Sequence, residues 1–169
     1  MIAFAFSAAL HDTLLRHSSV IMNNGKGYMF LGKSGTGKST HSKLWYKYIN
    51  GSDLLNDDNP AVRFFPENNK VFVYGTPWSG KTPCYRNLRV ELGAVVRLKQ
   101  YKENTRKREG KVGAFASILS SCSTMIWDKD TYNGICNTAS AIAGITPVYY
   151  LRCRPDEEAA RLSYNTIAQ

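Results

Sequence analysis

The sequence lacks a long apolar run. No stretch among its 169 residues approaches the ~20 consecutive apolar residues that cross a bilayer. Residues 1–10 (MIAFAFSAAL) are apolar, but no basic leader accompanies them as it does in a targeting signal. We therefore expect a strand at residues 1–10, a cytoplasmic location and no membrane partner.

Closely spaced cysteines are also lacking. The four cysteines are scattered without the short spacings that a zinc site or a thioredoxin-like motif requires. They are Cys84, Cys122, Cys136 and Cys153. Reduced structural thiols are therefore expected at all four positions.

Acidic residues are few: Asp and Glu number 13 against 22 Lys and Arg, which gives a formal net charge of +9. A positive surplus favours anionic partners such as nucleotides, phosphoproteins or nucleic acid. Much of it lies in residues 99–111 (KQYKENTRKREGK), a run so polar that it predicts a mobile, solvated loop. Only Tyr101 interleaves with these charges and no nucleic-acid-binding motif is evident, so no nucleic-acid partner is expected.

The length and the 43% content of hydrophobic residues predict one globular domain over residues 1–169. Apolar patterns with the strand period alternate with patterns of helical period, which indicates an α/β fold. The expected strands are residues 17–23, 27–31, 53–55, 61–65, 70–74, 92–98 and 147–153. Helices are expected for about three turns after Lys38, within residues 112–122 and 132–143, and from Pro155 onward.

A glycine-rich segment, residues 32–39 (GKSGTGKS), meets every fixed position of the P-loop pattern G-x-x-x-x-G-K-[ST]. It also follows an expected strand and precedes an expected helix, as that pattern requires. Small residues let the main chain curl so that several N–H groups converge on a phosphate chain. Lys38 then brings a cation to the β- and γ-phosphates, and the Ser39 hydroxyl can bind Mg²⁺. The expected nucleotide-binding residues are Gly32, Lys33, Ser34, Gly35, Thr36, Gly37, Lys38, Ser39 and Thr40.

Two adjacent carboxylates, Asp57 and Asp58, follow Lys38 by 19 and 20 positions at the end of an expected strand. One could hold Mg²⁺ while the other accepts a proton from an attacking hydroxyl. A merely polar turn explains the pair equally well. His17 by itself indicates little, because a lone histidine is usually a surface or satisfied core residue.

Taken together, these features resemble the HPr kinase/phosphorylases and their relatives in the phosphoenolpyruvate carboxykinase-like class. In that family a histidine starts a strand that hairpins into the P-loop strand, and an Asp-Asp pair follows after one helix. Residues 17–22 (HSSVIM), the glycine-rich segment and the aspartates match this order, and residues 92–96 (LGAVV) match a Leu-Gly strand. The resemblance covers most of residues 14–98. Two departures, Thr40 in place of a frequent acidic residue and Val90-Glu91 in place of Arg-Gly, suggest a divergent relative.

The resemblance implies an α/β P-loop domain with a mixed β-sheet and flanking helices, using ATP and Mg²⁺. It would place His17, Lys38, Ser39, Asp57 and Asp58 around the γ-phosphate, with Asp57 as the base and Ser39 and Asp58 at the metal. The implied activity is transfer of the γ-phosphate to a hydroxyl of a protein serine or a small molecule. A carboxykinase-like lyase and a non-catalytic nucleotide-binding regulatory domain are the alternatives. Because family members assemble as oligomers, a homo-oligomer is also expected.

One further segment, residues 75–81 (GTPWSGK), combines an aromatic ring and a cation on a restricted loop. Such a loop could meet a phosphate or a second substrate. A structural loop whose Trp78 fills part of the core is nearly as well supported. Arg86 and Arg97 are further candidates for phosphate contacts, although a solvated arginine is the commoner case.

Overall fold

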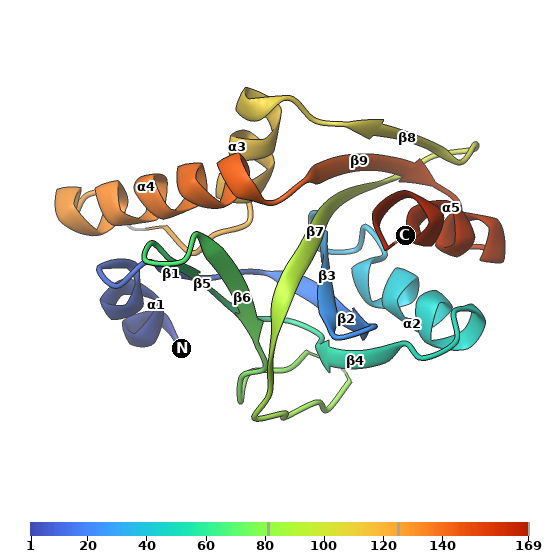
Figure 1. Cartoon of the computed structure of the whole chain (residues 1–169), viewed down its shortest axis with the longest axis horizontal. Coiled ribbons are helices and arrows are strands. Elements are labelled where there is room, and N and C mark those ends of the chain that lie inside the picture. Colours follow the sequence, from blue (N-terminus) through green and yellow to red (C-terminus); the bar gives the residue numbers. More distant parts are fainter. Residues whose placement is uncertain (81, 125, 169) are drawn as a thin grey trace.

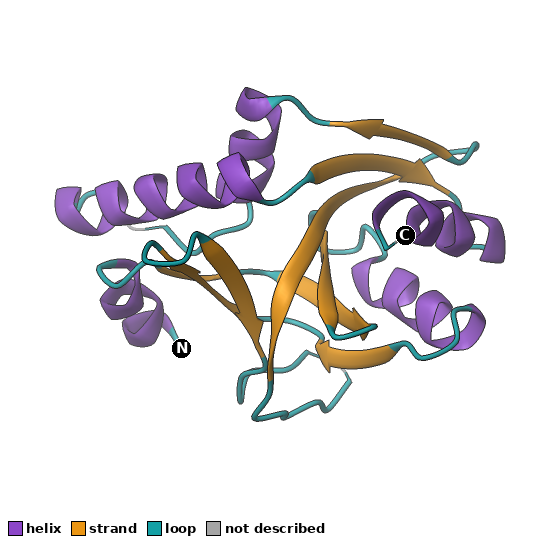
Figure 2. Cartoon of the chain, viewed as in Figure 1, coloured by secondary structure: helices purple, strands orange, loops and turns teal. Residues whose placement is uncertain are grey.

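The computed structural model describes residues 1–80, 82–124 and 126–168. It is a mixed α/β fold in which one curled sheet carries helices on both faces (Figure 1; Figure 2). Among the described residues the sheet has nine strands, and seven of them follow the order β1-β5-β6-β7-β3-β2-β4. The remaining two, β9 and β8, continue from β7, so β7 borders β6 near its start and β9 near its end.

The strands are β1 (Thr13–Leu15), β2 (Ser18–Asn23), β3 (Lys26–Leu31), β4 (Asp53–Asn56), β5 (Ala61–Phe65), β6 (Lys70–Tyr74), β7 (Arg89–Gln100), β8 (Thr105–Arg108) and β9 (Val148–Cys153). The helices are α1 (Ile2–Ala9), α2 (Lys38–Tyr48), α3 (Lys111–Leu119), α4 (Lys129–Ile145) and α5 (Glu157–Ile167). None of these helices is long and apolar enough to cross a membrane.

Alternating apolar side chains of the central strands divide the core into two layers. Val20, Met29 and Val95 pack on one face with residues of α3 and α4, and α1 lies against α4 and β1 on the same side. Their neighbours Ile21 and Phe30 pack on the other face with α2 and α5. This period of two is the pattern of a sheet covered on both sides.

The hairpin of β2 and β3 positions the candidate site. In their antiparallel register Ser18 lies opposite Leu31, so the residue before β2 and the residue after β3 end at the same edge. Strand β4 is antiparallel to β2, with Asn56 opposite Val20, which brings the end of β4 to this edge as well. His17, the glycine-rich segment and the two aspartates are therefore gathered by strand pairing alone.

Two sequence expectations were wrong. Residues 2–9 form the helix α1, with Ala5 and Ala9 buried, because four alanines among eight residues favour a helix over a strand. The supposed loop at residues 99–111 instead contains the end of β7 and the whole of β8, which pairs with β9 while all its side chains face solvent. The exposed charged side chains of β8 do not prevent its backbone from pairing with β9, and charged side chains are typical of an edge strand.

Most other elements are confirmed within a few residues at their ends. The last helix begins slightly later than expected, because Asp156 rather than Pro155 caps it by accepting a hydrogen bond from the Ala159 N–H at 2.9 Å. The short strand β1 was not expected. All four cysteines are free thiols, as the sequence indicated.

Candidate functional site

The glycine-rich loop (residues 32–39) forms a sharp turn between β3 and α2. The Thr36 N–H donates to the Lys33 carbonyl oxygen at 3.1 Å, which closes the turn. Gly35 and Gly37 have φ angles of 80° and 102°, a backbone region that side chains disfavour. Gly37 caps α2, so the N–H groups of the first helical turn begin where the loop ends.

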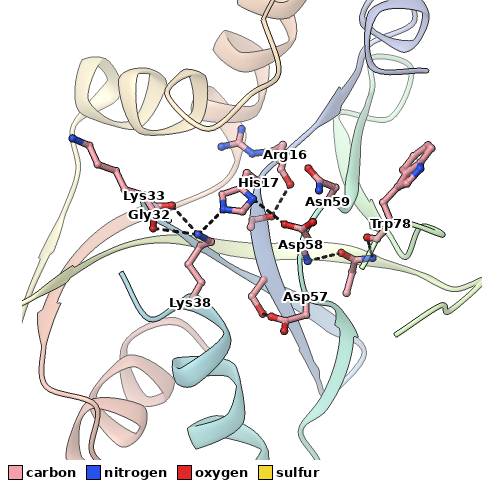
Figure 3. Close-up of polar contacts among 12 residues, drawn as sticks. Arg16, His17, Gly32, Lys33, Lys38, Asp57, Asp58, Asn59 and Trp78 are labelled. Carbon is pink, nitrogen blue, oxygen red and sulfur yellow. Dashed lines mark hydrogen bonds and ion pairs between the residues drawn. The ribbon is translucent and has the colours of Figure 1, made fainter. Parts of the chain in front are cut away.

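Lys38 is buried, and its ammonium group is held within the loop. Nζ donates to the carbonyl oxygens of Gly32 at 3.0 Å and Lys33 at 3.3 Å, and it lies 3.0 Å from His17 Nε2 (Figure 3). Burial lowers the pKa of Lys38, and the nearby charges of Asp58 and Asp57 oppose that effect. The opposing carboxylates favour the charged form, which a phosphate-binding lysine requires.

His17 connects Lys38 to Asp58. Its Nδ1 lies 2.9 Å from Asp58 Oδ1, while Nε2 faces the Lys38 ammonium. An ammonium can only donate, so Nε2 must accept and the ring proton must lie on Nδ1, from which it is donated to the carboxylate. The three groups therefore form one directed chain, Lys38 to His17 to Asp58.

Asp57 has a different environment from Asp58. It is buried, and its Oδ1 accepts a hydrogen bond from Ser19 Oγ at 2.7 Å. Ser19 Oγ is also 2.7 Å from Ser42 Oγ on α2. A pocket of about 220 Å³ is lined by Asp57 together with Ser39 and Ser42. Ser39, a candidate Mg²⁺ ligand, thus lines the same pocket as Asp57, although the surface of this pocket is almost entirely apolar, whereas Asp58 faces His17.

The aspartate turn is held in place by residues that the sequence did not single out. Asn56 Nδ2 donates to Thr76 Oγ1 and to the Trp78 carbonyl oxygen, each at 3.2 Å, while its Oδ1 accepts from the Asp58 N–H at 3.0 Å. Thr76 Oγ1 also donates to the Asn59 carbonyl oxygen at 2.8 Å. The sequence shows only an Asn directly before the pair; its burial, which makes the amide need partners, is seen in the structure alone.

These contacts give the loop after β6 a structural part in the site. Trp78 is half-buried, with its ring centroid 5.2 Å from that of Phe4 on α1. At Gly80 an added Cβ would lie 2.9 Å from the Asp57 carbonyl oxygen, so only glycine lets this loop pass so close to the aspartates. Lys81, the cation expected in this segment, lies outside the described residues.

The two arginine candidates have different surroundings. Arg86 forms two contacts with Asp53, at 2.5 and 2.9 Å, and so is engaged at the start of β4. Arg97 lines two hollows that border the glycine-rich loop, of about 270 and 520 Å³. Arg97 therefore borders space that an anionic molecule could occupy, with its guanidinium 6.0 Å from the centre of the Tyr150 ring, whereas Arg86 is paired with Asp53.

Within the described residues, no three His, Cys, Asp or Glu side chains gather closely enough to hold a metal ion by themselves. Mg²⁺ does not require such a cage, because it commonly takes one or two protein oxygens and completes its shell with phosphate oxygens and water. Asp57 and Ser39 are oxygen-bearing residues of the kind that mode of binding uses, and they line one pocket, although Asp57 Oδ1 already accepts from Ser19.

No protein-family model matches this sequence, and no curated protein matches it. Among solved structures, the chain is similar to the Hpr(Ser) kinase/phosphatase from Coxiella burnetii at 14% identity. The match covers 90% of this chain and 95% of that one, with a TM-score of 0.47. A likeness at this level leaves the function to be inferred from the site itself.

Proposed function

We propose that this protein binds ATP with Mg²⁺ at the glycine-rich loop and transfers the γ-phosphate to a hydroxyl group. The observation that carries the proposal is the chain from Lys38 through His17 to Asp58, with contacts of 3.0 and 2.9 Å. It joins a phosphate-binding cation to a carboxylate that can take a proton. A loop that only binds nucleotide needs no such connection.

The loop residues fit the phosphate groups. The left-handed glycines allow the main chain to wrap around an anion, and the helix that starts at Lys38 adds the partial positive charge of its N-terminus. Lys38 would exchange its two carbonyl partners for phosphate oxygens. When bound, Mg²⁺ supplies charge neutralisation across the β- and γ-phosphates, and this accounts for much of what phosphoryl transfer needs.

For the aspartates, the geometry favours the reverse of the roles expected from the resemblance. Asp57 shares a pocket with Ser39, which suits the residue that helps to hold Mg²⁺. Asp58 is more accessible, with 28% of its side chain exposed, and it faces His17. We therefore assign Asp58 as the base that receives the acceptor's proton, with His17 keeping that carboxylate oriented.

The proposed step balances in atoms and charge. The acceptor oxygen forms a bond to the γ-phosphorus while its proton passes to Asp58, and the bond from that phosphorus to the bridging oxygen breaks to release ADP. The nucleoside triphosphate is the substrate, and the products are ADP and a phosphate ester. Positioning and electrostatic stabilisation supply most of the rate in reactions of this kind.

Calorimetry with ATP and Mg²⁺ tests the nucleotide-binding half of the proposal. Lys38→Ala should abolish detectable binding, or weaken it at least 100-fold, because it removes the only buried cation of the loop that faces the phosphates. Lys47→Ala, a change at an exposed position of the same helix, is the matched control and should bind normally. Unchanged affinity in a folded Lys38→Ala variant would remove the basis of the proposal.

A further inference from the structure

Arg16, the residue before His17, is a buried arginine without an anionic partner. Its side chain is 1% exposed; Nη2 donates to Ser121 Oγ at 2.5 Å, and Nη1 lies 3.7 Å from Cys122 Sγ. Its Nε is buried and has no hydrogen-bond partner. In the part of the chain that the structure describes, no carboxylate forms an ion pair with it.

The neighbouring thiol does not neutralise this charge. Burial raises the pKa of Cys122, an effect that the charge of Arg16 only opposes, so the thiol carries its proton at neutral pH. Burial also lowers the pKa of Arg16, yet a guanidinium stays protonated in proteins at neutral pH. A buried charge left without a counter-charge is costly, so an anion close to it would be stabilised.

Arg16 lies next to the lining of a pocket beside the candidate site. This His17 pocket has a volume of about 270 Å³ and is lined by His17, Leu31, Gly32, Lys33, Arg97 and residues 120–123. Arg16 is not itself a lining residue, but its guanidinium contacts two residues that are, Ser121 and Cys122. In Figure 3 the Arg16 guanidinium lies above the His17 ring, on the side away from Lys38.

The chemistry of the lining favours an anion. Lys33 and Arg97 add two cations, and none of the described lining residues is acidic. Ser123 offers a hydroxyl group that can donate to a carboxylate or phosphate and accept from an alcohol. The hydroxyl groups of Ser120 and Ser121 already donate to the carbonyl oxygens of Ser117 at 3.1 Å and Ile118 at 3.5 Å. The volume lies just below the range for drug-sized ligands, which indicates a smaller molecule.

We propose that the His17 pocket binds a small hydroxylated anion, and that this anion is the phosphoryl acceptor. Its anionic group, a carboxylate or a phosphate monoester, faces Arg97, Lys33 and Ser123. A hydroxyl of the same molecule then lies at the His17 end, next to the loop and to Asp58. The acceptor role rests on the function proposed above, whereas the binding of an anion does not.

Three compounds with one carbon skeleton test the selection. Glycerate carries a carboxylate, glycerol 3-phosphate a phosphate monoester, and glycerol no charge. Each is titrated into the full chain with ADP and Mg²⁺ saturating, so that the loop is occupied, while amide NMR signals are followed. We expect at least one acid to shift the signals of residues 120–123 saturably, and glycerol to bind at least tenfold more weakly. The acid that shifts these signals at the lower concentration identifies the preferred anionic group.

Matched variants connect the effect to the pocket. Arg97→Gln should weaken acid binding about tenfold, because it removes a charged donor from the lining. Arg106→Gln removes the same charge from an exposed position on β8 and should change nothing. Loss of the acid response in the Arg97 variant, with the remaining spectrum intact, separates a local effect from unfolding.

Two outcomes overturn the inference: neither acid shifts residues 120–123, or glycerol binds as tightly as the acids. Nucleotide binding, on which the proposed function depends, is tested separately by the NMR signals of residues 32–39 when ADP and Mg²⁺ are added. If these respond while the acids do not bind, the pocket proposal falls and the proposed function stands. If the acids bind but ADP does not, the nucleotide proposal falls and the anion site stands.

Discussion

At the scale of single residues, Lys38 and His41 of helix α2 are both buried, but burial has a different result for each. Lys38 is buried beside carboxylates that favour its charge, and its ammonium group remains next to the loop. His41, one turn later, is buried without a carboxylate, and burial lowers its pKa to about 4. It lies 2.9 Å from Ser163 Oγ, and that hydroxyl already donates to the Ala160 carbonyl oxygen. Ser163 therefore accepts from the His41 ring, which is neutral.

The depressed pKa of His41 predicts a pH-dependent stability. The unfolded chain gains a proton near the ordinary histidine pKa of about 6.5, whereas the folded chain resists protonation until about pH 4. The stability of the folded protein with neutral His41 is therefore fully present above pH 6.5, and part of it is lost as the pH falls toward 4. Between pH 7.5 and 5 this loss should lower the free energy of unfolding by about 2 kcal/mol.

Urea denaturation of the wild type and of His41→Gln at both pH values measures this contribution. Glutamine keeps a donor for Ser163 but does not titrate, so the variant should lose about 2 kcal/mol less than the wild type on acidification. Equal losses in the two proteins would show that other groups cause the pH dependence.

At the scale of elements, helix α4 carries two glycines with opposite surroundings. An added Cβ at Gly134 would lie 2.5 Å from the carbonyl oxygen of Ala9, so this glycine lets α1 pack closely against α4. At Gly144, near the end of the helix, an added Cβ would meet nothing within 4 Å. The contact at Gly134 is also why the end of α1 fits beside α4.

The same substitution should therefore have opposite effects at the two positions. Gly134→Ala should destabilise the protein by about 1–3 kcal/mol, because backbone must move to relieve the overlap. Gly144→Ala should be neutral or stabilise it by up to about 0.5 kcal/mol, since alanine is the better helix former. Free energies of unfolding from urea titrations decide the matter, and destabilisation of similar size at both positions would contradict the packing described for α1.

The sequence predicted the elements around the site because their signals are local. The hairpin of β2 and β3 has an Asn-Gly turn, and the helix after the loop has apolar residues at helical spacing. Strand β8 was mispredicted because its state depends on a distant partner, whereas the four alanines of α1 are a local helix signal that its apolar character masked. The packing of α1 needs Gly134 on α4, and β8 needs the edge of β9. The family resemblance suggested that His17 and Lys38 lie together. The buried position of the Arg16 charge next to Ser121 could be seen only in the structure.

At the scale of the whole molecule, the fold brings three chain segments to one sheet edge and leaves a loop and a serine-lined pocket on either side of His17. The net charge of +9 assists both proposed ligands, since nucleotide phosphates and small acids are anions. A phosphotransferase and a nucleotide-binding module differ in one respect here: only in the phosphotransferase does the Asp58 carboxylate take part in turnover.

The most direct test is ADP formation by Asp58→Asn at saturating ATP and Mg²⁺, with ATP affinity measured on the same sample and water as the acceptor if no other is known. Asparagine keeps an oxygen that can accept from His17 but cannot take up a proton at neutral pH. We predict that ATP affinity changes less than about threefold, while turnover falls by ~10²–10⁴. Wild-type turnover in this variant would contradict the account, and would leave the aspartates as a polar turn beside a nucleotide-binding loop.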